Sequence, residues 1–149
     1  MSLRRLALAV TFVGAAACGD NQDPAGADAF WTSIHADDYR SWSRPPGFEA
    51  RRPTSGPHGD AVDIYVSDEI AAALGGGPLT AWPVRARIVK DAFEGDAVTT
   101  VAAMEKRADG WYWAEWSADG DAKYSGAPEL CTGCHASGGD FVRAFALPE

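Results

Sequence analysis

Two cysteines and a histidine lie close together near the C-terminus, in the run Cys131-Thr132-Gly133-Cys134-His135. This Cys-x-x-Cys-His spacing is typical of covalent attachment of haem c. Two thiols one helical turn apart can form thioethers with the two vinyl groups of a haem, and the adjoining imidazole can bind the iron from the same side. The motif therefore predicts one covalently attached haem c, held by Cys131 and Cys134, with His135 as the proximal iron ligand.

A redox dithiol or half of a zinc site would also use a Cys-x-x-Cys pair. Zinc would need two further ligands, and the only other cysteine is Cys18. Cys18 follows an N-terminal stretch that has the organisation of an export signal, so it is not expected in the folded domain. The haem interpretation is the one that accounts for all three residues of the motif.

The export signal is predicted over residues 1–17, from two arginines at 4 and 5, an apolar run over 6–13 and small residues at 15–17. The apolar run is too short to cross a bilayer as a helix of the mature protein. Cys18 after three alanines resembles a bacterial lipobox, in which this cysteine is lipidated. We therefore expect a periplasmic protein anchored to a membrane by lipid on Cys18; ordinary cleavage near Ala17 would instead leave a free thiol.

Composition limits the remaining possibilities. The chain has 149 residues and a formal net charge of −8, with no run of Lys or Arg. This argues against binding to nucleic acid and against an electrostatic membrane contact, whereas an acidic surface would suit a basic redox partner protein. After the signal we expect a flexible tether over residues 18–27 and a single haem domain over residues 28–149.

The order of expected elements is a helix, several hairpin-linked strands and a last helix that carries the haem motif. This order predicts a β-rich α+β fold: an antiparallel sheet of about five strands with an N-terminal helix, a short crossing helix and a C-terminal haem-bearing helix. The helices are expected at 28–39, 70–74 and the haem motif, and a loop at 44–59. The strands are expected at 62–66, 84–93, 97–106 and 111–116, followed by a short fifth strand that ends near Tyr124.

The chain resembles the cytochrome P-460 family, which includes the cytochrome c′-beta proteins, over about residues 30–145. The resemblance rests on the order of short fragments ahead of a C-terminal haem motif: His58-Gly59, Val62-Asp63-Ile64-Tyr65-Val66-Ser67, Trp82-Pro83-Val84, Ile88-Val89-Lys90-Asp91, the segment 101–107, Gly110-Trp111-Tyr112-Trp113 and Asp140-Phe141-Val142. It implies a haem in a β-rich domain, usually a homodimer, with an open or weakly occupied distal position. Enzymatic members oxidise hydroxylamine, and c′-beta members bind nitric oxide or carbon monoxide.

Lys90 falls where the enzymatic members carry a lysine cross-linked to the porphyrin. Strand alternation also places it on an otherwise apolar face, with Val84, Ala86 and Ile88. A desolvated ammonium has a lowered pKa, so its neutral amine is more available as a nucleophile. The alternative is that the strand ends here and Lys90 extends to water.

The resemblance also implies a carboxylate over the distal face, to accept substrate protons. That position aligns with Ala102, and Glu105 is expected on the opposite strand face. Without a distal base, binding of a small neutral gas is the simpler function. An apolar distal wall could come from aromatic residues that can equally be simple core, namely Phe48, Trp82, Phe93 and Trp113.

The sixth iron ligand has two candidates in the expected domain. His58, flanked by Pro57 and Gly59, could bring an imidazole to the iron or could stabilise its loop, and Met104 is more easily explained as core. His35 is expected on the first helix, towards solvent. Three functions remain open: a gas-binding haem protein, an oxidoreductase acting on hydroxylamine or nitric oxide, and an electron carrier that would need a firm sixth ligand.

Overall fold

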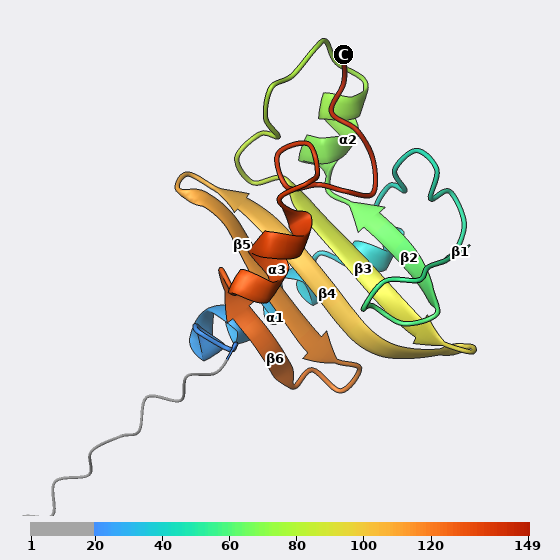
Figure 1. Cartoon of the computed structure of the whole chain (residues 1–149), viewed down its shortest axis with the longest axis vertical. Coiled ribbons are helices and arrows are strands. Elements are labelled where there is room, and N and C mark those ends of the chain that lie inside the picture. Colours follow the sequence, from blue (N-terminus) through green and yellow to red (C-terminus); the bar gives the residue numbers. More distant parts are fainter. Residues whose placement is uncertain (1–19) are drawn as a thin grey trace, which may run out of the picture.

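The computed structural model describes residues 20–149. The predicted export signal and Cys18 lie outside these residues. Six antiparallel strands form one sheet in the order of the sequence, so that each strand pairs with the next. Figure 1 shows this sheet as a meander that ends at the helix carrying the Cys-x-x-Cys-His motif. The strands are β1 (Arg52–Pro53), β2 (Ala61–Val66), β3 (Arg87–Glu94), β4 (Ala97–Arg107), β5 (Gly110–Ser117) and β6 (Ala122–Gly126).

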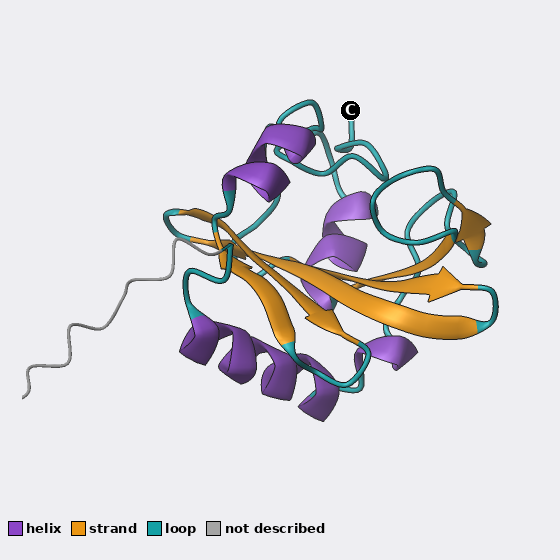
Figure 2. Ribbon diagram, turned by 60° about the horizontal axis from the view of Figure 1, so that its bottom comes forward, coloured by secondary structure: helices purple, strands orange, loops and turns teal. Residues whose placement is uncertain are grey.

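The sheet separates two hydrophobic cores, one on each face. Figure 2 shows helices on both sides of the sheet. Helix α1 (Pro24–Ala36) covers one face, where Phe30 and Ile34 pack on strand residues such as Trp116. The other face is covered by α2 (Asp68–Leu74), α3 (Glu129–His135) and the C-terminal segment, which contributes Val142 and Phe145. We call these the α1 face and the α3 face. A short 3-10 helix, η1 (Tyr39–Ser41), follows α1.

The predicted β-rich α+β fold with an antiparallel sheet is confirmed, but the sheet has six strands instead of about five. The additional strand is β1, in the segment expected to be only a loop: Arg52 and Pro53 pair with Val62 and Ala61 of β2. A two-residue edge strand with a proline has almost no sequence signal, because proline is tolerated only where a ladder bond is not needed.

The prediction of a flexible tether up to residue 27 is wrong for the residues that the structure describes. Helix α1 begins at Pro24, four residues before the expected Asp28, because Asp23 caps it by accepting a hydrogen bond from the Gly26 amide at 3.0 Å. Proline is favoured at the first helical position because its missing N–H would be unpaired there anyway. Ala27 is fully buried, and the Gln22 amide donates to the Ser125 carbonyl at 3.1 Å. This segment therefore belongs to the folded domain.

Strand β3 begins at Arg87, not at Val84 as expected. Arg85 has a left-handed backbone with φ of 76°, and the side chain of Val84 is 55% exposed. The chain therefore turns before it enters the sheet. From Ile88 onward the alternation is as predicted, with Ile88 and Ala92 buried in the α3-face core and Val89 in the α1-face core.

Asp91 is a carboxylate buried beneath η1 on the α1 face, with 1% of its surface exposed. The Tyr39 hydroxyl donates to its Oδ1 at 2.7 Å, and Arg40 Nε donates to its Oδ2 at 2.7 Å. Burial and this carboxylate together raise the pKa of Tyr39. These hydrogen bonds join η1 to the middle of β3 at Asp91, the residue next to Lys90.

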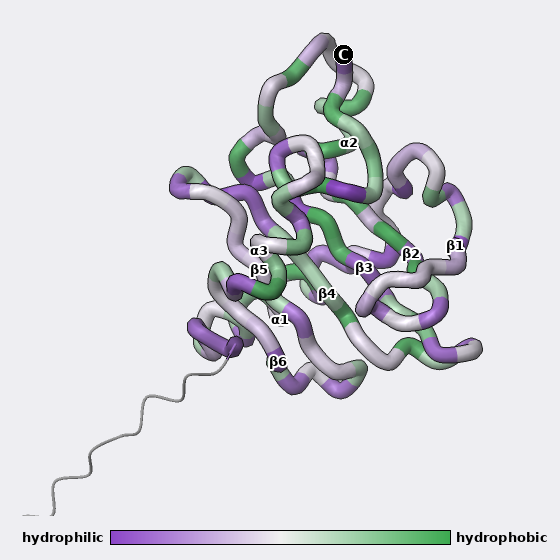
Figure 3. Tube along the Cα trace, viewed as in Figure 1, coloured by the Kyte–Doolittle hydropathy of each residue, from purple (hydrophilic) through white to green (hydrophobic). Residues whose placement is uncertain are grey.

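Hydrophobic residues follow the middle of β2 and β3, and the hairpin turns are hydrophilic (Figure 3). Among residues 20–149 we find no helix with the length and apolar character needed to span a membrane.

Candidate functional site

Helix α3 carries both cysteines of the motif within seven residues. It starts after Pro128, whose carbonyl accepts from the Cys131 and Thr132 amides at 3.0 Å. Cys131 packs against the α3-face core, and burial raises the pKa of its thiol to about 11. Cys134 is exposed, and Arg143 donates to its sulfur at 2.9 Å. Both thiols are free of disulfides, so both are available for thioether bonds.

His135 is held by the loop that follows α3. Its Nδ1 lies 2.9 Å from the Phe141 carbonyl oxygen. Because a carbonyl only accepts, this contact requires the proton on Nδ1 and leaves Nε2 with a free lone pair. Trp113 packs against the imidazole edge to face, with ring centroids 4.6 Å apart. Burial lowers the pKa of His135, which keeps the ring neutral, as a metal ligand must be.

These groups fit the chemistry that attachment of haem c requires. Two unpaired thiols stand one helical turn apart, and next to them is a neutral imidazole whose Nδ1 proton is already bound. Over residues 20–149, no three His, Cys, Asp or Glu side chains converge as the ligands of a metal ion would.

A row of five residues crosses the sheet on the α3 face. In the strand register Lys90 pairs with Ile64 on one side and with Ala102 on the other. Ala102 in turn pairs with Glu115, and Glu115 with Tyr124. Directly paired residues of an antiparallel sheet point to the same face. The register therefore puts an amine and a carboxylate on the face that α3 covers, with only an alanine between them.

Lys90 continues the apolar face as expected, between Ile88 and Ala92, and its side chain is partly buried. Loss of hydration on burial lowers the pKa of its ammonium, and the Glu115 carboxylate and the Cys134 sulfur act in the opposite direction. Arg143 lowers this pKa further. A lowered pKa increases the fraction of neutral, nucleophilic amine.

Glu115 is the site residue that the sequence reasoning missed. The expected carboxylate position, Ala102, indeed carries none, but its cross-strand partner does. Glu105 is on the opposite face, as expected, and accepts from Arg107 at 2.9 Å. The register of β4 and β5 was the missing information. Trp111, Trp113 and Glu115 share one face of β5, which indicates the face of Glu115 once the strand is aligned with β4.

His58 lies beside Glu115, where the loop before β2 brings it. Its Nδ1 is 3.1 Å from Oε2 of Glu115, close enough for an ion pair, although the two groups are not aligned for a hydrogen bond. His35 is far from this group: it stacks on Trp31 along the exposed side of α1, on the other face of the sheet. Met104 is buried in the α3-face core beside Ile88 and Trp113.

Of the four aromatic residues considered for a distal wall, three lie on the α3 face. Trp82 and Trp113 are buried in its core, and Phe48 packs against it. Phe93 does not: it alternates with Ala92, and the Arg51 guanidinium lies 3.4 Å from the centre of its ring. Phe93 thus belongs to the far side of the sheet.

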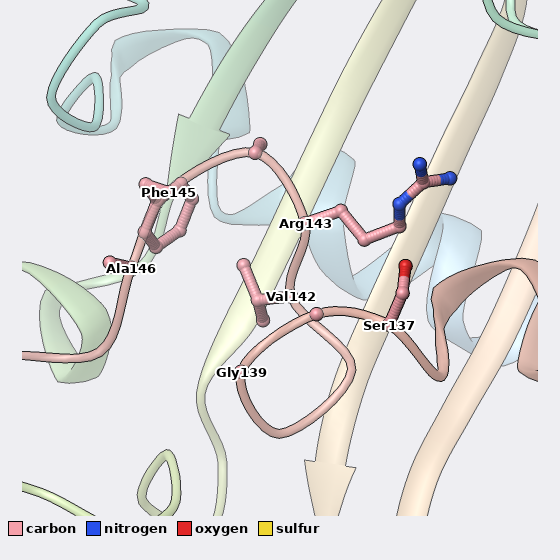
Figure 4. A pocket seen from close by; sticks show the side chains of 8 residues that line it. Ser137, Gly139, Val142, Arg143, Phe145 and Ala146 are labelled. Carbon is pink, nitrogen blue, oxygen red and sulfur yellow. The ribbon is translucent and has the colours of Figure 1, made fainter.

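The loop after α3 forms an open hollow of about 390 Å³. Figure 4 shows the Arg143 side chain extending over Ser137, with Phe145 and Ala146 on the opposite side of the loop. Arg143 thereby places a guanidinium beside Cys134.

No protein-family model and no curated protein matches this sequence. The assignment of a function therefore rests on the chemistry of the site.

Proposed function

We propose that this chain is an exported c-type haem protein that binds nitric oxide or carbon monoxide at an open position on the iron. The observation that carries the proposal is the donor set of α3: two free thiols and a neutral His135 with a fixed Nδ1 proton. In this proposal α3 is the haem-bearing helix, Cys131 and Cys134 form the thioethers, and His135 is the proximal ligand.

A bound haem would supply an iron with one position for a small ligand and with access to two oxidation states. The residues of the chain orient the proximal ligand. The Phe141 carbonyl fixes the ring and tautomer of His135, and Trp113 packs on its edge. Trp82 is buried in the α3-face core, and Phe48 packs against it. Apolar side chains of this kind beside the iron would favour neutral diatomic ligands over anions.

A second candidate function is oxidation of hydroxylamine or nitric oxide, and one specific observation favours it. The absence of a carboxylate at Ala102 no longer argues against this function, since Glu115 stands directly opposite Ala102 on β5. Its carboxylate could accept substrate protons. Lys90, in the same row and with a lowered pKa, is the amine that would form a cross-link to the porphyrin.

The other expectations remain part of the proposal. The protein would be periplasmic, anchored by lipid on Cys18 and otherwise free of the membrane, and would form a homodimer. A plain electron carrier, exchanging electrons with a redox partner protein, is the third function; it would require His58 or Met104 as a sixth ligand, and these contact Glu115 and the core, respectively.

The test is to express the full chain in a host that attaches haem c and to compare wild type with Cys131→Ala/Cys134→Ala. We expect the wild type to retain haem after denaturation, with the mass of one haem added, and the double variant to lose it. Thr132→Ser, which keeps the hydroxyl between the cysteines, is the matched control. A wild-type chain that leaves the host without covalent haem would overturn the proposal.

Optical spectra then separate the candidate functions. Ferrous protein that binds nitric oxide but leaves hydroxylamine unchanged supports the gas binder. Consumption of hydroxylamine, with a red-shifted Soret band that survives denaturation, supports the oxidoreductase and the Lys90 cross-link. An iron that binds neither ligand contradicts both and leaves electron transfer.

A further inference from the structure

The loop that holds His135 has an unusual backbone. Asp140 and Phe141 both have left-handed backbones, with φ of 46° and 66°. Aspartate tolerates this region, but a bulky residue such as Phe rarely adopts it. Such conformations persist where the surrounding structure holds them, and they are concentrated at functional sites. The conformation has a visible consequence here, because it turns the Phe141 carbonyl towards Nδ1 of His135.

The contacts that hold this turn come from the Asp140 side chain. Its carboxylate accepts from Lys106 Nζ at 2.7 and 2.9 Å and from the Trp82 amide at 2.8 Å. The Trp82 indole also donates to the Gly139 carbonyl at 3.3 Å. The side chains of Lys106 and Asp140 are only 17% and 13% exposed. Three donors from two other segments thus fix a single turn.

The two members of the pair are distant from each other in sequence. Lys106 lies near the end of β4, on the rigid sheet, and is 34 residues from Asp140. Its ammonium also lies 5.3 Å from the centre of the Trp111 ring, which favours a cation there. The turn is also closely packed at Gly138, where a Cβ would overlap the Val142 carbonyl. The sheet therefore determines the position of the Phe141 carbonyl through the Lys106–Asp140 pair.

We propose that Lys106 and Asp140 are positioning residues that set the electron donation of His135 to the iron. The proposal rests on the proposed function, in which His135 is the proximal ligand. A carbonyl that accepts the Nδ1 proton makes the imidazole more basic, and a more basic ligand stabilises ferric iron over ferrous iron. Loosening the pair lets the Phe141 carbonyl move away, so the reduction potential rises.

The experiment uses the full-length haem-loaded protein. We expect Asp140→Asn and Lys106→Met each to shift the ferric-to-ferrous equilibrium about tenfold towards ferrous, a rise of about 59 mV for one electron. Lys106→Arg should restore most of the wild-type value. Glu105→Gln is the matched control, because it breaks the Glu105–Arg107 pair of the same strand on the opposite face and should leave the potential unchanged. Changes that fail to add in the double variant Lys106→Met/Asp140→Asn would show that the two residues act together.

A second measurement does not depend on the variants folding well. In the diamagnetic ferrous carbon monoxide form of the wild type, the Nδ1 proton of His135 should give a slowly exchanging proton resonance. Its absence, or potentials equal to the wild type in both single variants, would overturn the proposal even if haem is attached. A chain without covalent haem would instead overturn the proposed function, so the two failures are distinguishable.

Discussion

Lys90 and Glu115 lie two strands apart in one row of the sheet, and the small side chain of Ala102 is all that separates them. The row runs across β3, β4 and β5 on the face that α3 covers. The register thus sets an amine and a carboxylate on either side of an alanine. It places acid–base groups next to the residues expected to hold the haem.

Glu115→Gln tests whether this carboxylate accepts protons. If the protein oxidises hydroxylamine, we expect the substitution to lower the turnover rate by about 10²- to 10³-fold, because an amide cannot take the proton. Nitric oxide binding should stay within about threefold of wild type, because a neutral diatomic needs no base. Stopped-flow absorbance measures both, with Glu105→Gln as control. A rate equal to wild type would remove Glu115 from the mechanism.

Lys90→Met tests the desolvated amine through the pH dependence of stability. The folded-state pKa of Lys90 is below its ordinary value, so between these two values the unfolded chain binds one more proton than the folded chain. The free energy of unfolding therefore rises with pH in this window. Urea unfolding of haem-free protein as the pH is raised towards the ordinary lysine pKa value of 10.5 should show this rise in the wild type and a weaker one in Lys90→Met. Lys123→Met, at an exposed lysine of β6, should keep the wild-type slope.

His58→Ala tests whether the loop histidine binds iron or accompanies Glu115. Because the proposed function leaves the distal position of the iron open and His58 lies against Glu115, we expect a high-spin ferric electron-paramagnetic-resonance signal in the wild type and in the variant alike. A low-spin wild-type signal that becomes high-spin on substitution would mean that His58 is the sixth ligand, and would favour the electron carrier.

Asp91→Ala tests the buried carboxylate behind Lys90. The substitution leaves the buried Tyr39 hydroxyl and the Arg40 guanidinium without their partner, so we expect a loss of about 3 kcal/mol in the free energy of unfolding. Asp96→Ala is the control, since this carboxylate is fully exposed in the β3–β4 turn and its removal should cost less than about 0.5 kcal/mol. Equal effects in chemical denaturation would mean that the Asp91 network contributes nothing specific.

The fold class was accessible from the sequence because local patterns carry it. The two-residue alternation of β2 and the turn residues between later strands predicted consecutive antiparallel strands, and the sheet has that order. The sequence-based prediction starts α1 too late because Asp23 and Pro24 also fit a flexible tether, although this pair is a good helix start. Strand β1 was missed because its pairing depends on β2 alone.

The sequence by itself determined which groups can do chemistry: two thiols and an imidazole at fixed spacing, and one lysine whose strand parity turns it inwards. Only the tertiary structure decided what surrounds them. The register between β4 and β5 put Glu115 opposite Ala102, the loop before β2 brought His58 to that carboxylate, and Lys106 of the sheet fixed the turn that holds His135. The physical reason is that spacing along one strand or helix follows from backbone geometry, whereas pairing between distant segments follows from the packing of the whole chain.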